Sequence, residues 1–192
     1  MGREFELKYA ATPEILAAIQ AQYNGFSAIA MDTTYFDTPS RAFSARKMTL
    51  RLRRENDKTL CTLKTPLADG SRGEWECPAA DIFTGLQALL SMGAPAETAG
   101  LAGDGLEAVC GARFTRLAVE IPLDGGSAEM ALDSGVLLGG GRELPLWEVE
   151  VELKSGSDEA VTAFAQALAE TFGLQPEPHS KFRRASALAQ GE

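Results

Sequence analysis

Two stretches far apart in the chain alternate charged and apolar residues with a period of two. In "WEVEVELK" (147–154), Glu148, Glu150 and Glu152 occupy every second position, with valine or leucine between them. The stretch "EFELK" (4–8) repeats the pattern near the N-terminus. Because successive side chains of a β-strand point to opposite faces, this spacing predicts two strands that each have one charged face and one apolar face.

The same alternation recurs elsewhere in the chain, which indicates a sheet rather than isolated strands. Four more stretches separate into a charged and an apolar side: 49–55, 72–77, 116–121 and 129–133. Together with the turn sequences between them, these patterns predict strands at 3–9, 27–36, 48–55, 59–66, 72–78, 115–123, 128–134 and 146–154, with a short hairpin at 135–144.

Helical patterns fill the gaps between the expected strands. We expect helices at 12–23, 81–93, 157–173 and 181–189, and a broken helix in the Gly-rich stretch 94–111. Thr12 followed by Pro13, and Ser157 followed by two acidic residues, are typical helix starts. The pattern therefore predicts an α+β domain whose strands are mostly antiparallel.

The charged faces of these strands allow two interpretations. In the first, the sheet packs one face on a core and exposes the other to water. In the second, the sheet closes into a barrel whose charged face lines the interior, while the helices at 12–23, 81–92 and 157–172 cover the apolar outside. Neighbouring like charges cost stability unless cations neutralise them, and the faces carry mainly Glu and Arg with few neutral polar residues. We therefore favour the barrel, with a ligand site in its interior.

Composition restricts what such a site can bind. The net charge of −9 argues against nonspecific binding of DNA or RNA. No stretch approaches the roughly 18 uninterrupted apolar residues of a membrane helix, and no signal peptide precedes the first strand pattern, so we expect a cytoplasmic protein. Cys61, Cys77 and Cys110 show no CxxC spacing and His179 is the one histidine, so a zinc site is not expected. A metal held by carboxylates favours Mg²⁺ or Mn²⁺.

A polyphosphate is the ligand that fits an interior of arginines, lysines and carboxylates. Guanidinium groups bind phosphate oxygens in pairs, and a divalent ion held by carboxylates bridges them. A dicarboxylate would not need the metal, and a sugar would not need so many arginines. The sequence contains no GxxxxGK[ST] motif, so a P-loop enzyme is not expected.

The sequence motifs resemble those of a known family, the CYTH superfamily of triphosphate tunnel metalloenzymes. The stretch "EFELK" is similar to the ExExK signature of that family. Further similarities follow in family order: "YFDTP" (35–39), "LRLRRE" (50–55), "TLKTP" (62–66), "RGEWE" (72–76), "FTR" (114–116), "ALDSG" (131–135), "EVEVELKSG" (148–156) and "SKFRRA" (180–185). The resemblance covers essentially the whole chain and is greatest to the bacterial inorganic triphosphatase branch.

This resemblance implies a fold and an activity. It implies one CYTH domain over 1–192, without a CHAD domain, built as an eight-stranded antiparallel β-barrel with a charged interior and amphipathic helices outside. It implies a metal-dependent hydrolase that converts tripolyphosphate to pyrophosphate and phosphate with Mg²⁺ or Mn²⁺. Three alternatives stay open: a class IV-type adenylate cyclase, a thiamine or nucleoside triphosphatase, and a noncatalytic polyphosphate-binding module. The expected partner is a small polyphosphate, and a homodimer is left open.

The resemblance also implies roles for individual residues. Metal ligands would be Glu4, Glu6 and Glu150, with Glu148 and Glu152 close by. The triphosphate path would be lined by Lys8, Arg51, Arg53, Lys64, Arg72, Arg116 and Lys181. Supporting carboxylates that orient these bases or a second ion would be Glu74, Glu76, Glu120 and Asp133. Catalysis would rest on Glu4, Glu6 and Lys8, with Glu4 or Glu6 activating the attacking water.

Other polar and aromatic residues have simpler explanations. Tyr35 is expected to pack at a strand end, and Asp37, before Thr38-Pro39, is expected to bond to the backbone of a turn. Trp147 has apolar parity and should lie beneath a helix. The pair Arg183 and Arg184 is expected to be solvated surface charge.

Overall fold

A computed structural model describes residues 2–3, 5–67 and 72–191, so the expected metal ligand Glu4 lies outside the described residues. Eight strands in the described chain have five residues or more: β2 (Glu6–Ala10), β3 (Ser27–Asp37), β4 (Thr49–Glu55), β5 (Lys58–Pro66), β6 (Arg72–Pro78), β7 (Glu107–Leu123), β8 (Gly126–Gly139) and β9 (Arg142–Ser155). Two more have two residues each: β1 (Gly2–Arg3) and β10 (Gln175–Pro176).

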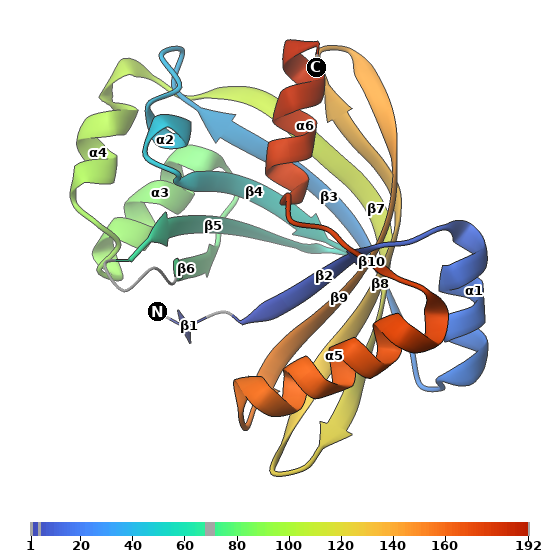
Figure 1. Ribbon diagram of the computed structural model, residues 1–192. Helices are drawn as coiled ribbons and strands as arrows, with labels where there is room; N and C mark the ends of the chain where they lie inside the picture. The colour runs from blue at the N-terminus through green and yellow to red at the C-terminus, as the bar shows by residue number, and fades with distance from the viewer. Residues whose placement is uncertain (1, 4, 68–71, 192) are drawn as a thin grey trace.

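These strands form one curved antiparallel sheet (Figure 1). Its order is β1-β6-β5-β4-β3-β7-β8-β9-β2-β10, and each pair of neighbours is antiparallel. One short N-terminal stretch reaches both ends of this order, because β1 pairs with β6 and β2 pairs with β9. Among the described residues, no ladder joins β6 directly to β2. The prediction of an α+β fold with an antiparallel sheet is confirmed.

Six α-helices accompany the sheet in the described chain: α1 (Pro13–Gln22), α2 (Ala42–Ala45), α3 (Ile82–Ser91), α4 (Glu97–Leu101), α5 (Asp158–Phe172) and α6 (Lys181–Gln190). The expected caps are present, since the Thr12 hydroxyl accepts a hydrogen bond from the Ile15 N–H and the Ser157 hydroxyl accepts one from Ala160. Gly173 ends α5 with a φ of 69°. None of the helices described here combines the length and apolar character needed to cross a bilayer.

The apolar face of the sheet points outward and is covered by helices, as the alternation predicts. Helices α1 and α5 cover strands β2, β8 and β9, where Ile19, Val161 and Val149 belong to one buried cluster. Helix α3 covers β5 and β6, where Leu89 packs in the same cluster as Leu63. Burying each such side chain contributes about 1.5–3 kcal/mol. Trp147 packs against the first cluster, so its predicted place beneath a helix is confirmed.

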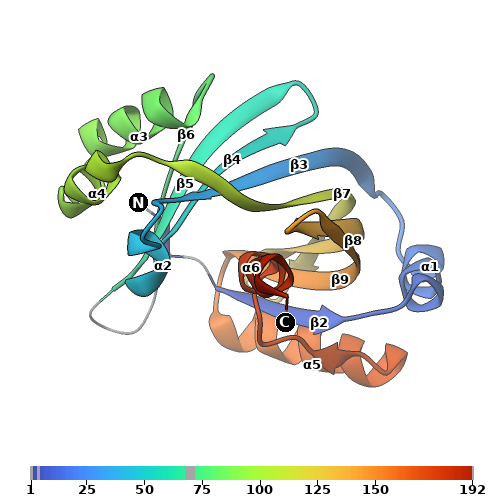
Figure 2. The same ribbon diagram turned by 90° about the horizontal axis from the view of Figure 1, so that it is seen from above.

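Helix α6 differs from the other helices because it lies on the inner face of the sheet. Figure 2 shows α6 enclosed by the curve of β3, β7, β8, β9 and β2. Its Ala185 packs with Phe114, Leu137 and Leu146, which share strand parity with charged interior residues. A Cβ at Gly139 would lie 2.4 Å from the Ala185 carbonyl oxygen, so only glycine admits the helix this closely. The sequence predicted outer cover by the helices at 12–23, 81–92 and 157–172 and gave no face for 181–189, so the inner position of α6 is a new finding.

Two regions of the sheet also differ from the sequence prediction. Strand β7 begins at Glu107, so the expected broken helix at 94–111 is limited to α4 and the short 3₁₀ turn η1 (Ala102–Asp104). The residues before 115 lack a clear alternation and become strand because they pair with β3 and β8 on both sides. The hairpin expected at 135–144 is the tip of the long β8–β9 hairpin.

Candidate functional site

The inner face of the sheet contains a cavity of about 510 Å³. Its wall includes side chains from each of the eight long strands and from the start of α6. Eight of the described lining residues are basic and seven are acidic, so the two signs nearly balance. Twelve residues that the sequence analysis assigned to a site line this cavity: Glu6, Lys8, Arg51, Arg53, Lys64, Arg72, Glu74, Glu76, Arg116, Glu150, Glu152 and Lys181.

One side of the cavity, formed by β4, β5 and β6, is rich in arginine and lysine; we call it the basic wall. Here Glu74 lies between two bases, with its carboxylate oxygens 3.8 Å from Arg51 Nη2 and 3.7 Å from Lys64 Nζ. Glu76 Oε2 lies 3.6 Å from Arg53 Nη2. Each carboxylate therefore holds its base in place at a distance that leaves the base able to bind an anion in the cavity.

Arg53 of the basic wall contacts Glu55 through Nη2 and still has one unused donor. Its Nε–H is buried and has no hydrogen-bond partner in the described structure. Burial lowers the pKa of Arg53, and the neighbouring Arg51 lowers it further. An anion bound in the cavity would accept a hydrogen bond from this Nε–H. It would also offset the unfavourable burial of the guanidinium charge and its repulsion by Arg51.

The opposite side of the cavity carries a row of three glutamates that face one another across neighbouring strands. Glu6 on β2 is in register with Glu152 on β9, and Glu152 is in register with Glu129 on β8. We call these three residues the glutamate row. Lysines lie beside it: Lys8 Nζ is 3.5 Å from Glu6, and Lys154 Nζ is 3.1 Å from Glu152 and 3.6 Å from Glu129. Like charges directly opposite each other destabilise a sheet, so this row favours the presence of a cation.

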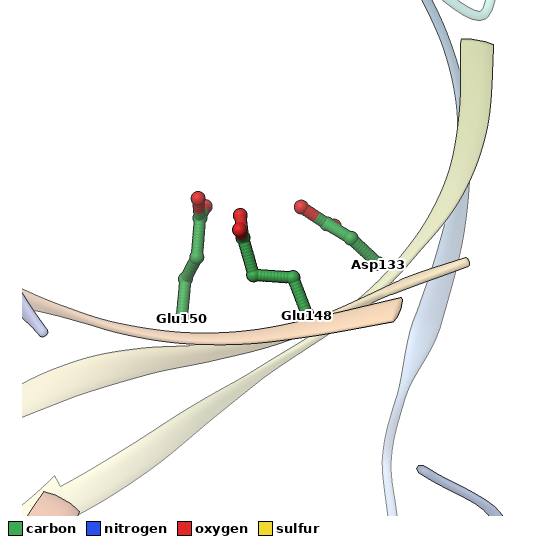
Figure 3. Close-up of side chains that lie close together, drawn as sticks. All are labelled: Asp133, Glu148 and Glu150. Atoms are coloured by element: carbon green, nitrogen blue, oxygen red, sulfur yellow. The ribbon is translucent and has the colours of Figure 1, made fainter. Parts of the chain in front are cut away.

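A second group of carboxylates extends from the cavity surface, at Glu150, into the wall behind it, and Figure 3 shows its side chains pointing toward one another. Asp133, Glu148 and Glu150 bring one oxygen each within 4.8 Å of the others. The side chains of Asp133 and Glu148 are 0% exposed. Lys181 lies among them, with its Nζ 2.8 Å from Asp133, 2.7 Å from Glu150 and in contact with Glu148.

Two arginines complete this buried group. Arg116 donates two hydrogen bonds to Asp133, of 2.8 Å from Nε and 2.7 Å from Nη2, and also contacts Glu150. Arg184 contacts Glu148 through Nη2. Three carboxylates and three cations thus neutralise one another. We call these six residues the ionic cluster.

The ionic cluster changes the pKa values of its members. Burial raises the pKa of Glu148, while Lys181 opposes that shift. Burial would also raise the pKa of Glu150, but Lys181 and Arg116 hold it well below its usual range. Burial alone would lower the pKa of Lys181, yet its three carboxylate neighbours raise it. Lys181 is therefore an ammonium ion at neutral pH.

The structure moves several predicted site residues away from the cavity surface. Asp133 and Glu148 lie behind the wall, where their oxygens bond to cations of the ionic cluster. Glu120 is exposed at the far end of β7 and is not among the described lining residues. Arg184 is not the solvated surface charge expected, because its side chain is 17% exposed and contacts a buried carboxylate. Neighbouring Arg183 is exposed, in line with its prediction.

One member of the glutamate row and one lysine beside it were not assigned to the site from sequence. Glu129 and Lys154 both line the cavity. The signal was present, since both lie on the charged side of their strands in "EMALD" and "WEVEVELK".

Residues with simpler expected roles are mostly confirmed. Asp37 accepts hydrogen bonds from the backbone N–H groups of Thr38, Phe43 and Ser44, at 2.8, 2.9 and 3.0 Å, and so fixes the turn into α2. Tyr35 packs against Phe182 with ring centroids 5.1 Å apart, as expected, but it also lines the cavity.

The donor set around the cavity fits a hard divalent cation. Glu6, Glu129, Glu150 and Glu152 present carboxylate oxygens to it, and no histidine or cysteine is among the described lining residues. Mg²⁺ and Mn²⁺ prefer such oxygen ligands. Of these four, Glu6, Glu129 and Glu152 have the most room to hold the ion at the cavity surface, because Glu150 also bonds to Lys181 and contacts Arg116.

Comparisons with known proteins agree with this fold. A model of the CYTH domain matches residues 2–186. The inorganic triphosphatase of Haemophilus influenzae is 30% identical over 177 residues, which are 88% of this chain and 50% of that protein. The chain therefore spans half the length of this relative.

Two solved structures share the fold at lower identity. The PH1819 protein of Pyrococcus horikoshii superposes with a TM-score of 0.67 and 23% identity, over 98% of this chain and 99% of that one. HpAC1 from Hippeastrum, a protein with a dominant triphosphatase activity, superposes with a TM-score of 0.69 and 18% identity, over 100% of this chain and 97% of that one. At these identities the two structures are informative about the fold alone. The family match, which spans nearly the whole described chain, identifies this protein as a member of the CYTH domain family.

Proposed function

We propose that this chain hydrolyses inorganic tripolyphosphate to pyrophosphate and phosphate, with Mg²⁺ or Mn²⁺. The observation that carries the proposal is the cavity lined by all eight long strands, in which a basic wall faces a glutamate row. A polyphosphate with a bound divalent ion matches both sides, since phosphate oxygens suit the arginines and the ion suits the carboxylates. The resemblance to the bacterial inorganic triphosphatase branch supports this substrate.

We further propose that the sheet encloses a closed tunnel. The pairing of β1 with β6 and of β2 with β9 supports closure, because residues 2–3 and 6–10, close in sequence, pair with opposite ends of the sheet. A closed tunnel excludes bulk water from the charged interior, which strengthens each electrostatic contact with the substrate. A cytoplasmic location, in keeping with the three free cysteines, belongs to the same proposal.

The chain's own residues would bind and polarise the substrate. Arg51, Arg53 and Lys64 on the basic wall would hold phosphate oxygens and neutralise the charge that develops as the terminal bond breaks. Lys8, between Glu6 and the ionic cluster, would contact a phosphate from the other side. Glu6 is the described carboxylate that we assign to accept a proton from the attacking water. A bound divalent ion would supply further charge neutralisation at the phosphates.

The test is phosphate release by the purified protein with tripolyphosphate, ATP or thiamine triphosphate, each with Mg²⁺ or Mn²⁺. We expect tripolyphosphate to be the best substrate. Phosphate release from ATP or thiamine triphosphate, without release from tripolyphosphate, would overturn the substrate assignment. Formation of cyclic AMP and pyrophosphate from ATP would identify a cyclase, and saturable binding without turnover would identify a binding module.

A further inference from the structure

Lys181 has contacts of two kinds that compete. It lines the cavity at the proposed substrate position, yet its ammonium group also bonds to three buried carboxylates. A phosphate in the cavity would attract the same ammonium group. When Lys181 turns toward a phosphate, its three carboxylates must be neutralised by the remaining cations of the ionic cluster.

The two arginines share this task unequally. Arg116 bonds to Asp133 and Glu150, so these two carboxylates keep a partner. Glu148 contacts Arg184 on its other oxygen, at Oε2, while Lys181 contacts Oε1. The side chain of Glu148 is 0% exposed, so water cannot replace the lysine. An uncompensated buried charge is strongly unfavourable, and Arg184 is the described cation that remains to prevent it.

Arg184 is also held where it can perform this role without touching the substrate. It is absent from the described cavity lining. Its Nη1 lies 3.6 Å from Glu177 Oε2, and the Glu177 N–H donates a 2.9 Å hydrogen bond to the Lys8 carbonyl oxygen. Arg184 is thus tied to the segment beside β2 as well as to β9.

We propose that Arg184 is a positioning residue that stays on Glu148 as its counter-ion and so releases Lys181 to bind a phosphate of the substrate. The proposal rests on the assignment of tripolyphosphate as the ligand. Without Arg184, Glu148 holds Lys181 more tightly, and the substrate loses one of its cationic partners. The expected defect is in substrate binding rather than in the rate of the chemical step.

The primary test compares Arg184→Met with Arg183→Met, a matched control from the exposed position next to it on α6. Tripolyphosphate binding is measured by calorimetry, and KM and kcat are measured with Mn²⁺. We expect Arg184→Met to raise Kd and KM about tenfold, which corresponds to ~1.4 kcal/mol, with a much smaller change in kcat. Arg183→Met should match the wild type. A residue with a purely structural role would lower Tm and leave Kd unchanged, which would overturn the proposal.

A double variant shows whether Arg184 acts through Glu148. In Glu148→Gln/Arg184→Met the buried charge is absent, so Lys181 is free again and most of the lost affinity should return. This variant also serves if Arg184→Met alone fails to fold. Arg184→Lys keeps a charge near Glu148 and should have an intermediate Kd. No recovery in the double variant would contradict the proposal.

The two proposals fail in different ways. Wild-type protein that binds tripolyphosphate without hydrolysing it removes the assigned reaction and leaves the Kd comparison intact as the test of Arg184. Wild-type protein that does not bind tripolyphosphate overturns both.

Discussion

The inner face of the sheet carries two groups of carboxylates with opposite characters. In the ionic cluster, Asp133 and Glu148 are fully buried, and their oxygens bond to Lys181 and two arginines at hydrogen-bonding distance. In the glutamate row, side chains are between 25% and 33% exposed and lie 3.1 to 3.6 Å from lysines. The first group is internally neutralised, whereas the second faces open space in the cavity.

This difference indicates two functions for the same residue type. The ionic cluster attaches α6 to the inner face of the sheet, because two of its cations, Lys181 and Arg184, belong to that helix. Its carboxylates have little remaining capacity for a metal ion while Lys181 stays among them. The glutamate row has partly hydrated oxygens on three adjacent strands, which suits a divalent ion that keeps some of its water.

The largest effect should come from removing the shared cation of the ionic cluster. Lys181→Met leaves three buried carboxylates with two cations, and breaking a buried ionic group of this kind costs about 3–5 kcal/mol. Urea unfolding of chelator-treated protein measures the loss in the free energy of unfolding. The matched control is Lys154→Met beside the glutamate row, where the lysine is 40% exposed and a loss below about 1 kcal/mol is expected. Equal losses would remove the distinction between the two groups.

The sequence predicts the shared face of these residues but not their division into two groups. Glu148 and Glu152 have the same parity on one strand, and the family resemblance implies a place beside a metal for both. They differ because Glu148 is in register with Asp133 and meets α6, whereas Glu152 is in register with Glu6 and Glu129. Register and the docking of a helix from 30 residues further along depend on long-range packing, which alternation does not encode.

The arginines of α6 illustrate the same limit. Arg183 and Arg184 are adjacent and chemically identical, yet one is exposed and the other bonds to a buried carboxylate. Positions on a helix differ by about 100° per residue, so the choice between them follows from which side of α6 faces the sheet. By contrast, the strand faces and the helix starts at Thr12 and Ser157 were predicted, because they depend on local spacing and capping.

The next largest effect should come from the basic wall, which lies across the cavity from the glutamate row. Arg53→Gln removes a buried guanidinium from the cavity, and we expect kcat/KM for tripolyphosphate to fall about 100-fold, as for the loss of one preorganised donor to a transition state. The control is Arg54→Gln, whose arginine is 65% exposed and lies 3.8 Å from Asp32 outside the cavity lining described above. Phosphate-release kinetics measure both. A similar fall in both variants would argue against a specific role for the basic wall.

The third prediction tests whether the glutamate row holds the metal. At Mn²⁺ concentrations near 100 times Kd, bound metal should stabilise the wild type by about 2.7 kcal/mol, and chelation should remove that gain. Glu152→Gln should abolish most of it. The control is Glu120→Gln, at an exposed position in register with Glu129 and outside the described cavity lining. This variant should keep the gain in stability with Mn²⁺. Unfolding curves with Mn²⁺ and with chelator give the difference, and an undiminished gain in Glu152→Gln would place the ion elsewhere.

The smallest expected effect is a gain in Mn²⁺ affinity instead of a loss of stability or activity. It distinguishes the glutamate row from the ionic cluster most directly. Lys154 contacts two members of the glutamate row and competes with a metal ion for their oxygens. Removing it by Lys154→Met should tighten Mn²⁺ binding, by an amount comparable to an exposed ion pair of about 0.2–1 kcal/mol, or up to about fivefold in Kd. Lys58→Met, at an exposed site on β5, is the control for net charge. Calorimetric Mn²⁺ titration measures both Kd values. Weaker Mn²⁺ binding in Lys154→Met would contradict this expectation. It would mean that Lys154 orients the glutamates for the ion, so that the glutamate row needs its lysine as the ionic cluster needs Lys181.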